Sequence, residues 1–382
     1  MRWHSGGISA GKRQNKTREM MELKRLFAAA VSIGLCLLML PAAFATEYGQ
    51  PDITADTTLK QVRENPSIAG SGILTYSKLG DSYNSMTRRM FENETISQYV
   101  VGNGEDSAAG LNLAIENYNR GIQVTWQVYT PEEIGRTPAR AAVQLFWFPA
   151  EQTGSRYAIV LGGNALGTSG ELSEGYSAAA ELHQLGYTVF VLRYSIEENR
   201  ADNAPLEDLT RAVRLVTEHA DEFGVQTEDY ALVGFSSGAQ IAGVFANRNY
   251  GYEHYGVQKP GVLLMAYPIV DLSAAKLACH ISCDPADYGW KYYWMNLKDA
   301  VEDGYPPVYF WRGDNDRSVS PAWMPGQHDD FAKALEAHGV PYQKIYYKNA
   351  PHGIGTGRGT DAEGWIEKAA AFWEEQCRGE TE

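Results

Sequence analysis

The sequence predicts an α/β fold with a mostly parallel central sheet flanked by helices. From residue 157 onwards, short apolar runs recur that have the length of a strand buried on both faces. Segments with apolar residues three or four positions apart separate these runs, and that spacing is typical of helices. Strands that alternate with helices pair in parallel, and the helices cover both faces of the sheet. Functional residues in such sheets gather at the carboxyl ends of the strands.

Each element is predicted from its own residues. Ile122–Tyr129 alternates apolar and polar residues, which predicts a strand with one buried face. Ala142–Trp147 is a second apolar strand, and the charged segment Pro131–Pro138 between the two is predicted as a turn. The other predicted strands are Tyr157–Leu161, Tyr187–Leu192, Tyr230–Val233, Val262–Ala266, Val308–Trp311 and Gln343–Tyr347. Helices are predicted over Glu174–Leu185, Pro205–Val216, Ala239–Ala246, Asp329–His338 and Ala362–Gln376.

Residues 1–45 have the three parts of a secretory signal peptide. A basic head precedes an uncharged apolar run, Leu26–Phe44, and Ala43-Phe44-Ala45 ends it in an Ala-x-Ala pattern, whose two small alanines fit a narrow peptidase pocket. We therefore expect cleavage after Ala45 and a secreted, extracytoplasmic protein. A membrane anchor is the alternative, because the run approaches the roughly 20 residues that span a bilayer. The Ala-rich start and Pro41 favour removal of the segment.

Two further parts follow the leader. Residues 46–120 are rich in Asn, Ser, Gly and Glu and are expected to form an N-terminal extension packed on the main domain. Residues 121–382 form the main domain, with an insertion, Asp271–Tyr305, before the strand Val308–Trp311. In this insertion Cys279 and Cys283 could close a small disulfide loop in an oxidising compartment. A metal site there is disfavoured, because the sequence has no second pair of ligands nearby.

The charge balance excludes one large class of partners. The 382 residues include 33 Lys and Arg against 47 Asp and Glu, a formal net charge of -14. A general nucleic-acid binder needs a basic surface to neutralise phosphates, so we expect no nucleic-acid partner. No apolar run beyond the leader is long enough to cross a bilayer, so we also expect no membrane partner after signal removal. No motif indicates a metal or an organic cofactor.

The segment Gly234-Phe235-Ser236-Ser237-Gly238 lies where a predicted strand gives way to a helix. In that setting the pattern G-x-S-x-G is typical of a nucleophile elbow, a turn so sharp that the residues two before and two after the serine must lack bulk. The turn presents Ser236 at the start of a helix, whose exposed N–H groups favour negative charge. A glycine turn without chemistry is the alternative, which the strand–helix setting disfavours.

A serine hydroxyl is a weak nucleophile until a base takes its proton, so a histidine is required. His352 is the predicted base. It lies in Ala350-Pro351-His352-Gly353, after the last strand and on the same edge of the sheet as Ser236. His280 and His328 are the reserve candidates, one from the insertion and one from the start of a helix.

The imidazole needs a carboxylate to hold its tautomer and stabilise its charged form. Two candidates, Asp314 and Asp316, follow the strand Val308–Trp311 on the same edge. Asp316, which stands three residues after Gly313 and three before Val319, is preferred on the family resemblance given below. Asp314 is expected to shape the turn.

Negative charge that develops on a substrate oxygen needs two donors aimed at one point. One is expected to be the backbone N–H of Ser237, which follows the nucleophile. The other is expected from the loop Gly162-Gly163-Asn164, where Gly163 and Asn164 are both candidates. An ordinary glycine turn is the alternative for this loop.

With these residues the chain resembles the α/β-hydrolase superfamily, and within it the acetyl-esterase, acetyl-xylan-esterase and feruloyl-esterase-like group. The resemblance runs from about Tyr157 to Phe372, and its motifs include Gly162-Gly163, Gly234–Gly238, Tyr267-Pro268 and Pro351-His352-Gly353. It implies an α/β-hydrolase fold and a serine ester hydrolase with the triad in the order Ser, Asp, His. The group usually has a third glycine where this chain has Asn164.

The sequence therefore predicts a secreted serine hydrolase that removes acetyl or feruloyl groups from carbohydrate through an acyl-enzyme intermediate. Trp290, Trp294 and Trp323 are candidates for stacking on a sugar or an aromatic acyl group, and packing of the insertion onto the domain is the alternative. A peptidase or amidase, or a lipase-type carboxylesterase, would use the same triad. A non-catalytic carbohydrate-binding module is disfavoured, because all three triad residues are intact.

Overall fold

The computed structural model describes residues 48–73, 92–102, 104–165, 168–195, 203–272, 295–318 and 326–378. Residues Tyr48–Glu382 belong to one compact unit. The predicted signal peptide, the Cys279–Cys283 pair and the three candidate tryptophans lie outside the described residues. None of the helices within these ranges combines the length and the apolarity that crossing a bilayer requires.

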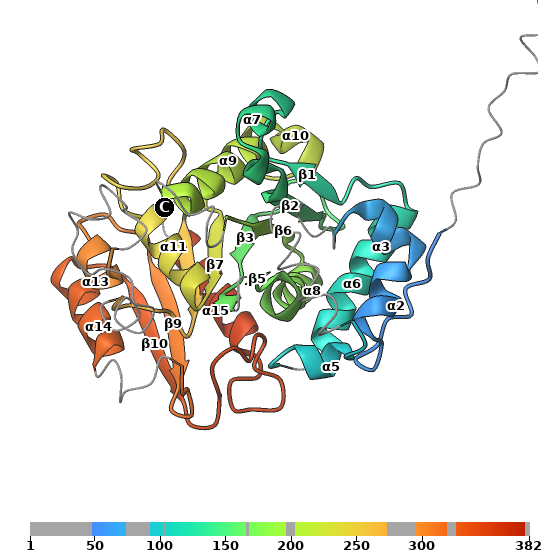
Figure 1. Cartoon of the computed structure of the whole chain (residues 1–382). Coiled ribbons are helices and arrows are strands. Elements are labelled where there is room, and N and C mark those ends of the chain that lie inside the picture. Colours follow the sequence, from blue (N-terminus) through green and yellow to red (C-terminus); the bar gives the residue numbers. More distant parts are fainter. Residues whose placement is uncertain are drawn as a thin grey trace, which may run out of the picture. The chain divides into compact units, whose positions relative to one another are not determined.

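Eight of the described strands form one sheet, in the order β1-β2-β6-β3-β7-β8-β9-β10 (Figure 1). Their bounds are Thr125–Gln127 (β1), Gln144–Phe148 (β2), Tyr157–Leu161 (β3), Thr188–Arg193 (β6), Ala231–Phe235 (β7), Val262–Ala266 (β8), Val308–Gly313 (β9) and Tyr342–Tyr347 (β10). The first two strands run antiparallel to their neighbours, and all neighbours from β6 to β10 are parallel. The predicted fold class, α/β with a mostly parallel central sheet, is confirmed. Two short strands, Asn164–Ala165 (β4) and Thr168–Ser169 (β5), pair separately.

Helices cover both faces of this sheet. In the main domain they are Pro131–Arg136 (α7), Tyr176–Gln184 (α8), Ala204–Glu218 (α9), Ala220–Phe223 (α10), Ser237–Phe245 (α11), Leu297–Ala300 (α13), Gln327–Ala337 (α14) and Trp365–Cys377 (α15). Pro138–Ala142 forms a 3₁₀-helix, and Glu171–Gly175 forms a π-helical turn before α8. Helices α9, α11 and α14 pack into one apolar core, and α8 and α15 pack into the other (Figure 1).

The central strand β3 shows why the apolar runs in the sequence are continuous. All five of its residues are buried. Because side chains alternate along a strand, Ala158 and Val160 join the core with α8 and α15, whereas Ile159 and Leu161 join the core with α9 and α11. A strand covered on both faces has no solvent side, so it needs no polar positions.

The described residues before the sheet contribute four further helices: Leu59–Glu64 (α2), Pro66–Ser71 (α3), Ile96–Tyr99 (α5) and Gly104–Asn119 (α6). Figure 1 shows them gathered beside α8, and α6 packs directly against α8. Leu111 and Ile115 on α6 are fully buried in the same core as α8 and α15. Capping boxes begin α2, at Thr58 and Gln61, and α5, at Thr95 and Gln98. Described residues of the segment 48–120 therefore share a core with the sheet.

The structure corrects two details of the predicted strands and turns. The predicted turn Pro131–Pro138 is wrong, because Pro131–Arg136 is helix α7. Thr130 caps this helix in a reciprocal box with Glu133, and proline occupies its first turn, where its fixed φ suits a helix. The predicted strand Ile122–Tyr129 is reduced to three paired residues, Thr125–Gln127.

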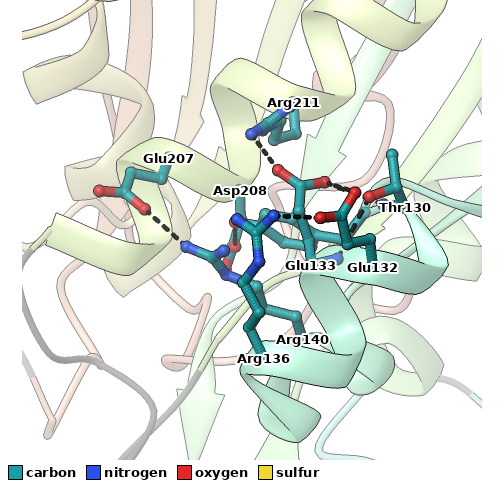
Figure 2. Close-up of polar contacts among 9 residues, drawn as sticks. Thr130, Glu132, Glu133, Arg136, Arg140, Glu207, Asp208 and Arg211 are labelled. Atoms are coloured by element: carbon teal, nitrogen blue, oxygen red, sulfur yellow. Dashed lines mark hydrogen bonds and ion pairs between the residues drawn. The ribbon is translucent and has the colours of Figure 1, made fainter.

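Charged side chains join α7 to α9 (Figure 2). Glu133 on α7 forms an ion pair with Arg211 on α9, and Arg140 pairs with Glu207 at 3.5 Å. These pairs are partly exposed, so each is worth at most about 1 kcal/mol. They surround Asp208, which is the one member of the group that is almost fully buried, at 1% exposure.

Asp208 accepts hydrogen bonds from the Tyr129 hydroxyl at 2.6 Å and from the Ser195 N–H at 2.7 Å. Burial raises the pKa of this carboxyl to about 6, and its hydrogen bonds only partly offset that effect. The proton is therefore held more tightly in the folded protein than in the unfolded chain. The resulting contribution to stability is present below about pH 4 and is lost as the pH rises through about 6.

We expect the replacement Asp208→Asn to remove this pH dependence. Relative to the variant, the wild-type protein should lose roughly 3 kcal/mol of unfolding free energy between about pH 4 and pH 7, because each pKa unit corresponds to about 1.4 kcal/mol. Urea unfolding of both proteins across this range measures the difference. If the unfolding free energies of the two proteins changed in parallel with pH, Asp208 would not titrate in this range.

Candidate active site

The sharp strand–helix turn predicted around Ser236 is present at the junction of β7 and α11. Strand β7 ends at Phe235 and helix α11 begins at Ser237, so Ser236 alone makes the turn. Its backbone has φ 52° and ψ -118°, a conformation that side-chain-bearing residues rarely adopt. Strain of this kind persists only where the surrounding structure enforces it.

The two glycines of the motif allow this turn. A Cβ atom at Gly234 would lie 2.3 Å from the Cα of Ala239, and one at Gly238 would lie 2.2 Å from the carbonyl oxygen of Leu161. Both obstacles are backbone atoms, which cannot rotate away. The close approach of strand and helix therefore requires glycine at both positions.

The structure brings Ser236, His352 and Asp316 together from three separate loops. The Ser236 Oγ lies 2.9 Å from His352 Nε2, and His352 Nδ1 lies 2.8 Å from Asp316 Oδ2. A carboxylate only accepts hydrogen bonds, so Nδ1 carries the proton, and Nε2 is left to accept from the serine hydroxyl. This is the arrangement in which an imidazole acts as a base toward serine.

The environment favours a fixed carboxylate beside a more accessible imidazole. Asp316 is 3% exposed, and its second oxygen accepts from the Ser318 N–H at 2.9 Å. The His352 side chain is 17% exposed, so solvent and substrate can reach it. It borders an open depression of about 280 Å³ that Asn315, Arg317, Ser318 and Pro351 also line.

The other candidates from the sequence lie elsewhere. His328 is buried on α14, stacks on Phe310 and donates from Nε2 to the Pro268 carbonyl at 3.1 Å. Burial lowers the pKa of His328 to about 4, so it is neutral at ordinary pH. Asp314 is exposed and pairs with Arg312 at 3.3 Å rather than with an imidazole. His280 lies outside the described part of the chain.

The loop predicted to supply the second oxyanion donor follows β3. The Gly163 N–H donates to Glu174 Oε2 at 2.5 Å, and the Gly163 carbonyl accepts from Gly170 at 2.6 Å. In this structure the Glu174 carboxylate therefore accepts the hydrogen bond that the Gly163 N–H donates. Because a trans peptide places C=O and the following N–H on opposite sides, the Asn164 N–H points away from Gly170. Of the two candidates, the Gly163 N–H is held by Glu174, whereas the Asn164 N–H points away from Gly170.

Glu174 was not a candidate in the sequence, where it is simply the first residue of a predicted helix. It is 5% exposed and accepts a second hydrogen bond, from the Tyr267 hydroxyl at 2.6 Å. That hydroxyl accepts in turn from the Gly355 N–H at 3.0 Å, and the Tyr267 ring lies 4.8 Å from the His352 ring. The partners are far apart along the chain, so no local sequence signal could have shown the contact.

The segment before the sheet also reaches the loop that carries His352. Asp106 on α6 is 4% exposed, accepts from the Thr356 hydroxyl at 2.5 Å and pairs with Arg358 at 2.5 Å. A Cβ atom at Gly102 would lie 2.7 Å from the Ile354 carbonyl oxygen. Residues of the segment before the sheet thus contact the loop that follows the imidazole.

The structure is similar to that of an acetyl ester-xyloside bifunctional hydrolase from Caldicellulosiruptor lactoaceticus. The TM-score is 0.55 and the identity 21%, over 66% of this chain and 95% of that one. The chain has the α/β-hydrolase fold. Ser236 and the loop that carries His352 both lie at the carboxyl ends of parallel strands, β7 and β10.

The family model BD-FAE matches residues 146–258 of this chain. The match includes Gly163 and Ser236 and ends before Asp316 and His352. Two curated relatives are endo-1,4-beta-xylanase B of Butyrivibrio fibrisolvens, 26% identical over 50% of this chain, and an acetylxylan esterase of Xylanibacter ruminicola, 23% identical over 56%. The chain spans only 31% and 44% of their lengths. These matches support the resemblance to acetyl-xylan-esterase-like proteins.

No group of three or more metal-binding side chains occurs among the described residues of this chain. The donor set at Ser236 contains one imidazole and one carboxylate that already bond to each other.

Proposed function

We propose that the protein is a secreted serine hydrolase that removes acetyl or feruloyl groups from carbohydrate. The observation that carries the proposal is the continuous chain of hydrogen bonds from Ser236 through His352 to the buried Asp316. The strained turn at Ser236 supports it, because backbone strain of this kind gathers at functional sites. The names of the relatives, a xylanase and an acetylxylan esterase, favour a carbohydrate ester as substrate.

The chemistry follows from the positions of these three residues. The Ser236 Oγ attacks the ester carbonyl carbon while its proton passes to His352 Nε2. The carbonyl oxygen becomes an oxyanion, toward which the backbone N–H groups of Ser237 and Asn164 are the proposed donors. The C–O bond to the alcohol then breaks, and the departing oxygen takes the proton from His352. Water repeats the sequence on the acyl-enzyme, which releases the acid and restores the serine.

Asp316 acts through His352 in this scheme. Its carboxylate accepts from Nδ1 and so keeps Nε2 free of a proton before the attack. When the imidazole takes the serine proton, the buried negative charge lies 2.8 Å from Nδ1 and stabilises the imidazolium. No metal or organic cofactor takes part in any of these steps.

Export is part of the proposal. The basic head, the apolar run Leu26–Phe44 and the small residues before Thr46 support a cleaved signal peptide. A polysaccharide cannot enter a cell, so an esterase acting on it has to work outside. N-terminal sequencing of protein collected outside the cell would give Thr46 as the first residue, and an intact leader would contradict cleavage.

A panel of substrates tests the reaction class. We expect turnover of p-nitrophenyl acetate, acetylated xylan and methyl ferulate, and at least about 100-fold slower turnover of aminoacyl p-nitroanilides of similar size. A long-chain p-nitrophenyl ester completes the panel and tests a lipase-type preference. Faster cleavage of the anilides would replace the proposal with a peptidase. Trp290, Trp294 and Trp323 stay predicted sugar or acyl contacts, because they lie outside the described residues.

A further inference from the structure

The buried carboxylate of Glu174 is connected to both halves of the proposed site. One of its oxygens holds the Gly163 amide in the loop after β3, and the other holds the Tyr267 hydroxyl after β8. The same hydroxyl holds Gly355, three residues beyond His352. Three loops that follow different strands are thereby joined through the side chains of Glu174 and Tyr267.

The fit around this carboxylate is tight. A Cβ atom at Gly163 would lie 3.0 Å from the Ser236 Cβ and 3.1 Å from Glu174 Oε2. A Cβ atom at Gly170 would lie 2.8 Å from the same oxygen. The Gly163 peptide thus fills the space between the nucleophile and the carboxylate. A change in the carboxylate position would move this peptide relative to Ser236.

Tyr267 connects Glu174 to the loop that carries His352. Its backbone has φ 39°, which is unusual for a residue with a side chain, and its side chain is fully buried. One face of the ring packs against His352, at 4.8 Å between ring centres. The hydroxyl donates one hydrogen bond to Glu174 and accepts one from the Gly355 N–H. The tyrosine therefore has one position, which Glu174 and Gly355 define together.

We propose that Glu174 is a positioning residue that holds the Gly162–Gly163 peptide, next to Asn164, and, through Tyr267, the His352 loop in register with Ser236. This inference rests on the proposed function and deepens it. Because the Gly163 N–H donates to the Glu174 carboxylate, the Asn164 N–H is the second donor to the oxyanion in this proposal. Burial raises the pKa of Glu174, while Tyr267, Gly163 and the nearby charge of His352 act in the opposite direction.

The test compares Glu174→Gln, Tyr267→Phe and the double variant with the wild-type protein on p-nitrophenyl acetate. Glutamine has the same shape, but its NH₂ end faces a donor, so one of the two bonds is lost. We expect each single variant to lower kcat by about 10- to 100-fold with KM changed less than about threefold, because the loss is one of alignment. The double variant should be no slower than the slower single variant, because both changes break one connection.

A matched pair elsewhere in the chain provides the control. Asp208 is also a buried carboxylate that accepts from a tyrosine hydroxyl, Tyr129, and from one backbone amide. Asp208→Asn and Tyr129→Phe should change the melting temperature and leave kcat within about twofold of wild type. A purely structural role for Glu174 would give the same pattern as this control.

Each outcome decides the inference. Wild-type kcat in E174Q and Y267F, losses no larger than in the control pair, or fully additive losses in the double variant would overturn it and leave the proposed function intact. Tyr267→Phe removes a single oxygen atom and gives the same readout if E174Q does not fold. A wild-type protein that neither hydrolyses esters nor reacts with a fluorophosphonate would overturn the proposed function, and this inference with it.

Discussion

Replacing Ser236 by alanine is expected to lower kcat/KM for p-nitrophenyl acetate by about 10⁴- to 10⁶-fold. The change removes the only hydroxyl that lies within hydrogen-bond distance of His352 Nε2 among the described residues. It adds no bulk to the turn, so the strained backbone and its glycine neighbours can stay in place. Steady-state kinetics together with the melting temperature separate lost chemistry from lost structure.

Ser155→Ala is the matched control for this prediction. Ser155 lies just before β3, at the opposite end of the sheet, and its hydroxyl contacts Thr188 at 2.9 Å. We expect this variant to keep wild-type activity. If Ser236→Ala retained more than about 1% of the wild-type rate while folded, Ser236 would not be the nucleophile.

The second large effect is expected for Asp316→Asn. An amide at this position can donate to His352 Nδ1, which would favour the imidazole tautomer with its proton on Nε2. That tautomer cannot accept the serine proton, so kcat should fall by about 10³- to 10⁴-fold with little change in KM. The expected loss is smaller than for Ser236→Ala because the nucleophile and its base are still present.

Asp314→Asn distinguishes the two acids that the sequence offered. Asp314 is exposed, two residues away in the same loop, and pairs with Arg312. Its replacement should change kcat by less than about twofold, since exposed ion pairs contribute little. The reverse pattern, a large loss for Asp314→Asn and none for Asp316→Asn, would mean that the loop rearranges in solution.

Local rules were sufficient for the sheet and for the elbow. Continuous apolar runs such as Tyr157–Leu161 predict strands buried on both faces, and β3 has those bounds. The glycines at 234 and 238 predict a close strand–helix approach, and the structure puts backbone atoms where their Cβ atoms would be. The edge shared by Ser236 and His352 follows from parallel pairing alone.

Other features were recognised only in the folded structure. The capping box at Thr130 and Glu133 is a local signal that predicts helix α7, and charge and proline in that segment suggested a turn instead. The contacts of Glu174 with Gly163 and Tyr267 have no such signal, because they depend on a π-helical turn and on where β3 and β8 end. Sequence patterns report periodicity and local caps, whereas the connection of three loops through one carboxylate is a tertiary property.

The residue that reacts with a fluorophosphonate tests the central claim most directly. Such a probe bonds to a serine oxygen only where a base takes its proton and an oxyanion site receives the phosphoryl oxygen. Mass spectrometry of the labelled and digested protein should find the modification on Ser236, and Asp316→Asn should slow the labelling. A protein that hydrolyses esters and carries the label on another residue, or carries none, would contradict the account.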